Sequence, residues 1–281
     1  AAYLLLLRLT GSRWAGVAAG VVFAFNAYKM SNLAQAQLLA VQWLPLALLY
    51  IERILSPRGV ANAGQRAAWR SALLLAIFVA LQALSSFYYA SLSAVAIGLA
   101  IALHVLVQRR LNWSSLARLT LALAAAVLIV LPFVTPYLRV ESELGFKRTL
   151  ADAEPFSASL RQYAEALPSS ALYSSLAARP PVVVGGYPLD ALFPGAATLA
   201  LAILGLLAWR RRPHLWAFPL GLALVSFTLS LGPTLMLSPG QPLAMPFAMP
   251  YRLLYLLPGM AALRAPVRFS ALVFLGLSML A

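Results

Sequence analysis

The sequence predicts an all-α protein, a polytopic transmembrane helical bundle with one large extracytoplasmic segment. Of its 281 residues, 62% are hydrophobic and 10% are charged, whereas soluble domains have roughly 45–50% apolar and about 25% charged residues. The mean hydropathy is +0.85. These polar residues are too few to cover the surface of a soluble fold. The chain has no cysteine, which excludes disulfides, thiolate nucleophiles and zinc–thiolate sites.

The apolar stretches are separated by short polar breaks and have the length of membrane spans. A bilayer core requires about 20 apolar residues in a helix, and roughly 17 is the lower limit. We therefore expect about seven complete spans and two partial ones. The complete spans are predicted near residues 14–30, 37–52, 71–87, 88–107, 117–134, 191–209 and 215–232, and the partial ones at 1–8 and 266–281.

One chain reversal is predicted inside the long apolar stretch 71–107, which has room for two helices. Ser85 and Ser86 are followed by Phe87, Tyr88 and Tyr89. Small polar residues next to aromatic ones are typical of the membrane interface. The sequence therefore predicts that one helix ends and the next begins there.

The formal net charge of +14 is explained by membrane topology. With Arg8 placed inside and the spans alternating, the inner segments hold 12 basic residues and one acid, Glu52. The outer segments hold nine basic residues and six acids, so the net charges are +11 inside and +3 outside. Cytoplasmic loops of membrane proteins collect Lys and Arg. The basicity therefore requires no nucleic-acid partner, and we expect an integral protein of the bacterial cytoplasmic membrane in contact with membrane lipids.

Three regions follow from these spans. Residues 1–134 are predicted to be transmembrane helices with short loops, and 135–190 to be an extracytoplasmic segment. Residues 191–281 are predicted to be transmembrane helices interrupted by a Pro-rich interfacial segment, 233–265. Within the outer segment, Ser159 and Gln162 have capping-box spacing before an apolar stripe, which predicts a helix over 159–167.

Arg264 and Arg268 form the first candidate site. They flank Pro266, which is well placed as the first residue of the final helix, and no acid occurs between residues 191 and 281. A helix N-terminus and two guanidinium groups favour binding of a lipid phosphate. The alternative is that both arginines reach lipid headgroups without a specific site.

Lys29, Asn32 and Gln35 form the second candidate site, for substrate. They recur at three-residue intervals at the outer end of span 14–30. Their amides and ammonium group can bind sugar hydroxyls or a pyrophosphate, and the alternative is a polar hairpin at the interface. No metal site or cofactor is expected. The acids of the predicted outer segment are typical of a solvated loop, and the two histidines, His104 and His214, lack carboxylate neighbours in the sequence.

Several short stretches give the chain a resemblance to bacterial GT-C-type glycosyltransferase-like membrane proteins, including the YfhO-type group. The stretches are Phe23-Ala24-Phe25-Asn26, Gln42-Trp43-Leu44-Pro45-Leu46, Ile51-Glu52-Arg53, Ser86-Phe87-Tyr88-Tyr89, Leu192-Phe193-Pro194-Gly195, Leu257-Pro258-Gly259 and Arg264-Ala265-Pro266-Val267-Arg268-Phe269. The resemblance covers nearly the whole chain. It implies transfer of a sugar from a polyprenyl-phosphate carrier at the extracytoplasmic face.

The resemblance also implies an acidic catalytic residue in the first outer loop of the family. The chain begins at Ala1, inside an apolar run, and we expect it to be a fragment that starts in the second span. The catalytic residue is therefore unknown, and we expect it upstream of Ala1. Near Asn32 and Gln35 the family often has His, whereas this sequence has amides. Two other functions stay open, a lipid or polysaccharide transporter or flippase and a non-catalytic membrane scaffold.

Overall fold

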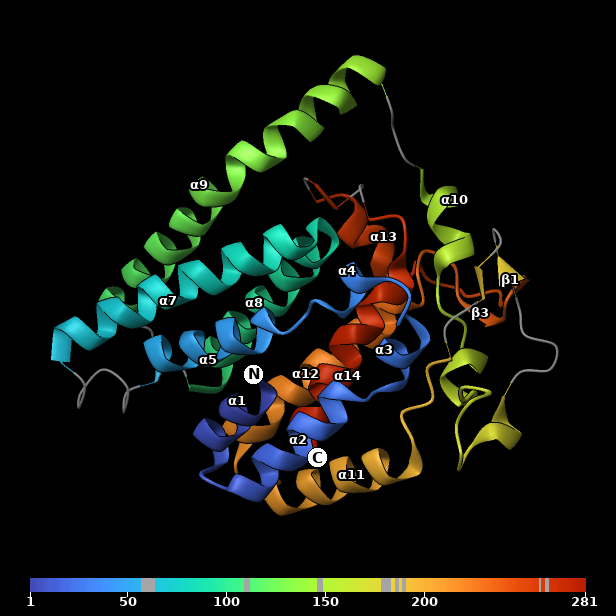
Figure 1. Ribbon diagram of the computed structural model, residues 1–281, viewed down its shortest axis with the longest axis horizontal. Coiled ribbons are helices and arrows are strands. Elements are labelled where there is room, and N and C mark those ends of the chain that lie inside the picture. Colours follow the sequence, from blue (N-terminus) through green and yellow to red (C-terminus); the bar gives the residue numbers. More distant parts are fainter. Residues whose placement is uncertain are drawn as a thin grey trace. The chain divides into compact units, whose positions relative to one another are not determined.

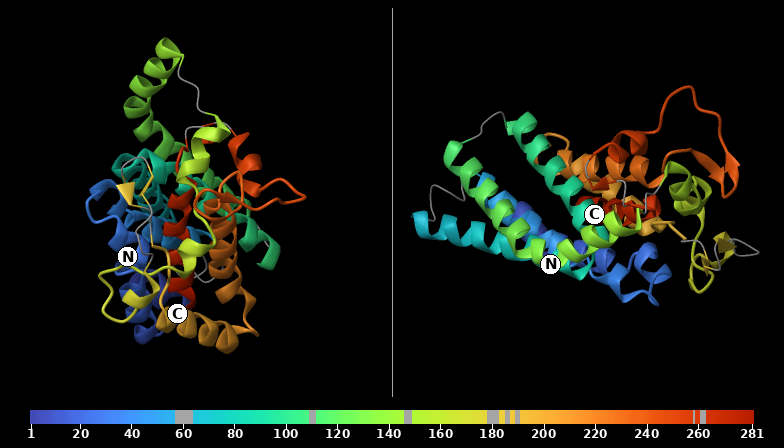
Figure 2. Two further views of the ribbon diagram at one scale, coloured as in Figure 1. Left: turned by 90° about the vertical axis from the view of Figure 1, so that its right-hand side faces the viewer. Right: turned by 90° about the horizontal axis from the view of Figure 1, so that it is seen from above.

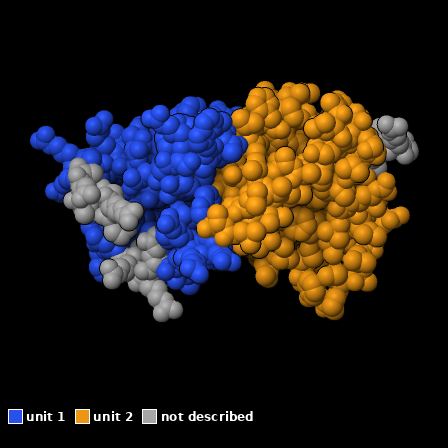
Figure 3. Space-filling view, turned by 90° about the horizontal axis from the view of Figure 1, so that it is seen from below, with its two compact units in different colours: residues 1–20, 40–147, 209–218 blue, residues 21–39, 148–208, 219–281 orange. Residues whose placement is uncertain are grey.

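The computed structural model describes residues 1–56, 64–108, 112–145, 149–177, 183–184, 187–188, 191–257, 259–260 and 263–281. The chain divides into two compact units, each assembled from stretches that are far apart in the sequence (Figure 1 and Figure 3). Unit 1 consists of residues 1–20, 40–147 and 209–218, and unit 2 of residues 21–39, 148–208 and 219–281. The division into membrane and outer segments at residues 134 and 190 stays a prediction.

The described part of the chain is all-helical apart from two short hairpins, and five of its helical segments are long and apolar enough to cross a membrane. These are Ala36–Leu55, Gly64–Ser85, Phe87–Val107, Trp113–Tyr137 and Pro213–Ser230. They correspond to five of the seven complete spans predicted. The predicted span 191–209 holds a helix of only 14 residues, α11 (Ala196–Trp209), and the full span count stays a prediction.

The predicted span 14–30 is divided into two helices, α2 (Arg13–Ala24) and α3 (Ala27–Ser31). Asn26 causes the break. Its side-chain oxygen accepts the backbone N–H of Lys29 at 3.0 Å, and its amide nitrogen donates to the carbonyl of Phe23 at 2.8 Å. A capping side chain satisfies the backbone donors of a new helix start. The prediction of one continuous helix over 14–30 was therefore wrong.

Unit 1 is built around α7 (Gly64–Ser85), which contacts α5 (Trp43–Leu55), α8 (Phe87–Gln108) and α9 (Trp113–Leu144). The predicted reversal is confirmed, because α7 ends at Ser85 and α8 begins at Phe87. The ring of Phe78 stacks on Trp43 and Tyr50, with centroids 5.9 and 5.6 Å apart. The short α1 (Ala2–Thr10) joins this group through α5 and an ion pair of 3.1 Å between Arg8 and Glu52.

A buried glutamine fixes the start of α5. Gln82 of α7 is 1% exposed. Its amide nitrogen donates to the carbonyl of Ala40 at 2.7 Å, and its oxygen accepts the N–H of Leu44 at 3.0 Å. A buried backbone group without a partner is costly, so this side chain stabilises the junction between α4 (Ala36–Leu39) and α5.

The helix α9 extends ten residues beyond the predicted end at 134 and passes through Pro132 and Pro136. Between the two prolines, the Thr135 hydroxyl donates to the carbonyl of Leu131 at 2.8 Å. The prolines remove the helix bonds to the carbonyls of Leu128 and Pro132, and such prolines are tolerated in membrane helices. The helix ends at Gly145, whose φ is 61°.

Unit 2 is organised around α14 (Ser270–Leu280), which is buried on almost every side. Helices α12 (Pro213–Ser230) and α14 cross closely at Gly276, where an added Cβ would lie 2.6 Å from the carbonyl oxygen of Pro219 (Figure 1 and Figure 2). At Gly205 of α11, an added Cβ would lie 1.8 Å from the Leu280 oxygen. Small residues allow membrane helices to approach this closely.

The segment after α9 is irregular but packed. It contains α10 (Leu150–Ala153), the 3-10 turns η1 (Glu154–Phe156), η2 (Arg161–Ala164) and η3 (Ser174–Leu176), and the hairpin of β1 (Val183–Val184) and β2 (Tyr187–Pro188). The predicted helix over 159–167 was wrong, because only η2 is helical there. Gln162 does bind the N–H of Ser159, at 2.7 Å. The backbone is held by other elements instead, since the N–H of Leu160 donates to Met236 and that of Leu192 to Gln162.

The Pro-rich segment forms a second hairpin, of β3 (Met236–Ser238) and β4 (Gln241–Pro242), followed by α13 (Pro250–Tyr255). The 3-10 turn η5 (Pro266–Phe269) then leads into α14. No described residue of this segment belongs to a candidate span, and the apolar helix that follows it, Pro266–Leu280, is shorter than a candidate span. The segment therefore connects α12 to α14 and contains no helix of membrane-spanning length among its described residues.

Candidate functional site

Three segments of unit 2 meet where the last helix begins. Pro266 is the first residue of η5, so the predicted helix start is confirmed. Gly232 follows α12 with a φ of 71°, and an added Cβ would lie 1.9 Å from the Ser157 hydroxyl and 3.4 Å from the Pro266 ring. Glycine alone adopts this backbone conformation without cost and leaves room for the contact. The start of α14 is thereby held against the end of α12 and the segment after η1.

Arg264 lies at this junction and is exposed. Its guanidinium carbon is 4.6 Å from the ring centroid of Phe156, the last residue of η1. A cation over an aromatic face gains about 0.5–1 kcal/mol at an exposed site. The guanidinium group has five N–H donors, and the ring accepts none of them in a conventional hydrogen bond, so donors remain for an oxyanion.

Arg252 belongs to the same junction, although the sequence gave no role to it. Its Nε donates to the carbonyl of Pro233 at 2.9 Å. The neighbouring Tyr251 is buried, and its hydroxyl donates to the carbonyl of Leu263. This bond joins α13 to the residue that precedes Arg264. Arg252 lies in the same acid-free stretch, residues 191–281, as Arg264. That sequence signal could therefore have identified Arg252 as well.

Arg268 is half-buried on η5. Its backbone N–H donates to the carbonyl of Ala265 at 3.1 Å, and Pro266 has no N–H. The first turn therefore offers fewer backbone donors than the sequence predicted. Side chains are the main hydrogen-bond donors at this helix start.

The described carboxylates of unit 2 are engaged away from Arg264. Their contacts join Asp152 to Thr149 at 2.7 Å, Glu154 to Thr234 at 2.6 Å and Glu165 to Arg161 at 2.7 Å. Asp190 is outside the described residues. Within the part of the chain that is described, Arg264 thus has no carboxylate partner, and its charge is compensated only by the Phe156 ring.

The second predicted group does not share one helix face. Lys29 is in α3, Asn32 is the residue that ends this helix, and Gln35 precedes α4. The Lys29 ammonium lies 3.9 Å from the ring centroid of Phe23, and burial lowers the pKa of Lys29 to about 8. Asn32 is buried and its amide nitrogen donates to the carbonyl of Tyr28 at 2.9 Å.

Within unit 2, α3, which holds Lys29, contacts α14, the helix that directly follows Arg264 and Arg268 in the chain. Gln35 is half-buried, and its backbone N–H donates to the Asn32 carbonyl at 2.9 Å. The Asn32 amide nitrogen is thus occupied by its own helix, whereas the Lys29 ammonium contacts an aromatic ring. Lys29 is the member of this group whose polar atom is best placed to meet a further ligand.

The acidic stretch of the outer segment forms no metal centre among the described residues. There, no group of three or more His, Cys, Asp or Glu side chains could hold a metal ion. Asp152 and Glu154 belong to different local structures, since the first caps α10 and the second binds Thr234.

The long apolar helices define the class of the molecule as a helical integral membrane protein. No protein-family model, curated protein or solved structure matches the chain. The argument for function therefore rests on the residues and their geometry.

Proposed function

We propose that the chain is a GT-C-like membrane glycosyltransferase that takes a sugar from a polyprenyl-phosphate carrier at the extracytoplasmic face of the bacterial cytoplasmic membrane. The donor phosphate binds Arg264 and Arg268 at the start of α14. The single observation that carries the proposal is Arg264, whose exposed guanidinium lies over the Phe156 ring and has no carboxylate partner among the described residues.

The proposed geometry assigns different tasks to the arginines. Phe156 orients the Arg264 guanidinium, whose N–H edge forms paired bonds to phosphate oxygens. Arg268, on η5, adds charge at the same helix start. Arg252 is held by the Pro233 carbonyl and contributes positive potential. In this proposal Lys29, Asn32 and Gln35 lie toward the sugar or its pyrophosphate, and none of the described residues is assigned as the catalytic acid.

The competing transport function requires polar groups free to serve a substrate inside the spans. Gln82 is the buried polar residue of α7, and both ends of its amide bond to backbone groups near α5. No observation on the described helices favours transport over transferase activity.

The test is the affinity of the protein in nanodiscs for a polyprenyl phosphate. A charge-assisted hydrogen bond contributes roughly 1.5–3 kcal/mol, so Arg264→Ala is expected to weaken binding by about ten- to a hundredfold. Arg264→Lys keeps the charge but loses the paired bonds and is expected to recover only part of the affinity. Phe156→Leu removes the ring and keeps an apolar side chain, so it is expected to weaken binding by a smaller factor.

Arg210→Ala is the matched control, because Arg210 is equally exposed but follows α11. It is expected to bind as the wild type does. Wild-type affinity in Arg264→Ala and Arg268→Ala would show that both side chains are lipid anchors and would overturn the proposal.

Sidedness is tested separately by labelling single cysteines, since the chain has none of its own. Positions 62 and 142 fall in segments proposed to face the cytoplasm and the outside; Asn62 is outside the described residues. Reagent added from outside is expected to label position 142 alone. Labelling of position 62 from outside would refute the topology.

A further inference from the structure

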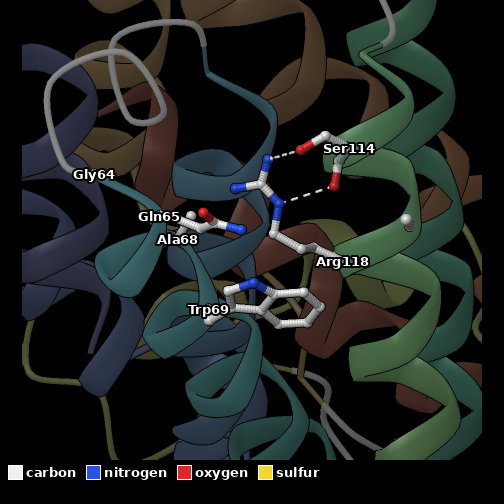
Figure 4. A pocket seen from close by; sticks show the side chains of 7 residues that line it. Gly64, Gln65, Ala68, Trp69, Ser114 and Arg118 are labelled. Atoms are coloured by element: carbon white, nitrogen blue, oxygen red, sulfur yellow. Dashed lines mark hydrogen bonds between the residues drawn. The ribbon is translucent and has the colours of Figure 1, made fainter.

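A cavity of about 340 Å³ opens in unit 1 between the starts of α7 and α9 (Figure 4). Its lining includes Gly64, Gln65, Trp69, Ser114, Ala117 and Arg118. Cavities that hold small ligands begin at about 300 Å³. The volume is therefore sufficient for a phosphate or phosphate-ester group.

The floor of this cavity is a buried cation. Arg118 is 6% exposed. Its Nε donates to the Ser114 carbonyl at 2.8 Å and one terminal nitrogen donates to the Ser114 hydroxyl. Figure 4 shows the guanidinium extending across the cavity toward the α7 side, where the Gln65 amide also lies. Arginine has five N–H donors, so its fork retains donors for a ligand in the cavity.

No carboxylate of unit 1 is in reach of this charge. The unit has three acids, Glu52, Glu141 and Glu143. Glu52 pairs with Arg8 at 3.1 Å. Glu141 and Glu143 follow Arg118 on α9 by more than 20 residues, which is about 35 Å of helix at roughly 1.5 Å per residue. A buried charge without a counter-charge is costly, and a bound anion would remove that cost.

The cavity lies at the end of two helices that are long and apolar enough to cross a membrane. It opens at the first turns of two candidate spans, Gly64–Ser85 and Trp113–Tyr137. Trp69 and Trp113 are both exposed at this end, and exposed tryptophans mark the membrane–water interface. Arg66 is exposed on the same turn of α7 and adds positive charge near the opening.

We propose that this cavity is an anion site in which Arg118 binds a phosphate oxyanion. The phosphate belongs either to the headgroup of an acidic phospholipid or to a soluble phosphate compound. The guanidinium offers paired donors to two oxygens, as it does for phosphates generally, and Gln65 adds an amide donor from the facing helix. This site is separate from the arginines near α14 and does not depend on the proposed transferase function.

The experiment measures binding of two probes to the whole chain in detergent by calorimetry. One probe is inorganic phosphate and the other is a short-chain phosphatidylglycerol, with short-chain phosphatidylcholine as the lipid reference. Arg118→Gln is expected to weaken binding of the preferred probe by about ten- to a hundredfold. A preference for inorganic phosphate indicates a soluble ligand, and a preference for phosphatidylglycerol indicates a headgroup.

Arg70→Gln is the matched control, since it removes one positive charge from the same end of α7 outside the cavity lining. It is expected to change affinity by less than about threefold, as screened surface charges do. Ala117→Leu fills the cavity without removing charge and is expected to weaken binding even if Arg118→Gln does not fold. The proposal is overturned if neither probe binds the wild type, or if Arg70→Gln weakens binding as much as the cavity variants do.

Discussion

Helices α9 and α14 are both strongly apolar, yet one is largely exposed and the other is enclosed. In α9, only 17% of the 18-residue apolar stretch within Trp113–Tyr137 is buried. In α14 every residue from Ser270 to Leu280 is buried except Leu277, which is half-buried. Hydropathy alone therefore identifies membrane-length helices but does not say which of them form the core.

The difference follows from side-chain size at the contacts. Gly276 brings α14 within contact of the α12 backbone, and Gly205 brings α11 within contact of its C-terminal end. In contrast, α9 presents large apolar side chains, among them Leu121, Val127, Leu128, Ile129, Leu131 and Phe133. Lipid tails solvate such side chains as well as protein does. Close packing, rather than apolar burial alone, therefore separates α14 from α9.

The largest expected effect is that of a bulky residue at the closest crossing. In Gly276→Leu the new Cβ would lie 2.6 Å from the Pro219 oxygen and 2.8 Å from the Ala223 nitrogen, so the helices must separate. Overpacking of this kind costs about 3 kcal/mol. The measurement is the free energy of unfolding in mixed detergent micelles.

Gly98→Leu in α8 is the matched control, because nothing lies within 4 Å of an added Cβ there. It is expected to change the free energy of unfolding by less than about 0.5 kcal/mol. Equal losses in the two variants would refute the packing difference between the helices.

The next effect compares the same substitution in the two helices. Leu275 of α14 is fully buried, whereas Leu128 of α9 is 68% exposed. Leu275→Ala leaves a cavity and is expected to lower the free energy of unfolding by roughly 2 kcal/mol. Leu128→Ala leaves none and is expected to change it by less than about 0.5 kcal/mol. A comparable loss at Leu128 would show that a protein surface covers α9.

The elements that hydropathy and turn residues determine were predictable from the sequence. The helix reversal at Ser85 and the start at Pro266 agree with the structure, because both depend on local chemistry. The continuous helix over 14–30 was wrong, since Asn26 caps a new helix from within an apolar run. The prediction of a helix over 159–167 was wrong because backbone N–H groups of this stretch donate to distant carbonyls, such as those of Met236 and Leu176.

The candidate sites also contain features that the sequence could predict and features that only the fold shows. Arg264 could be identified from an acid-free stretch of sequence, but its partner Phe156 is over a hundred residues away and follows only from the fold. Arg118 was counted as an ordinary cytoplasmic charge. Its burial depends on where α7 and α9 begin, which the predicted spans 71–87 and 117–134 placed several residues too late.

A smaller effect is expected where the segment after α9 attaches to α12. The Tyr163 hydroxyl is 2.7 Å from the Ser230 hydroxyl, and its ring packs edge-on against Phe227, with centroids 4.7 Å apart. Tyr163→Phe keeps the ring contact and loses the hydrogen bond, so a loss of about 1 kcal/mol is expected. Hydrogen exchange of residues 158–166 is the second measurement. Faster exchange there, but not in α9, is the expected pattern, and equal acceleration in both regions would contradict it.

The last prediction concerns Lys29, which lies outside the candidate spans on the helix that contacts α14. Burial lowers its pKa from 10.5 to about 8, so the unfolded chain binds more protons than the folded protein between these pH values. The free energy of unfolding is therefore expected to rise as the pH is raised from about 8 toward 10.5, and Lys29→Met is expected to remove this contribution. The chain has one other lysine, Lys147, so in Lys147→Gln the remaining side-chain amine can be dimethylated with ¹³C and titrated by NMR. A midpoint near 10.5 would show that the ammonium is fully hydrated and does not sit against Phe23.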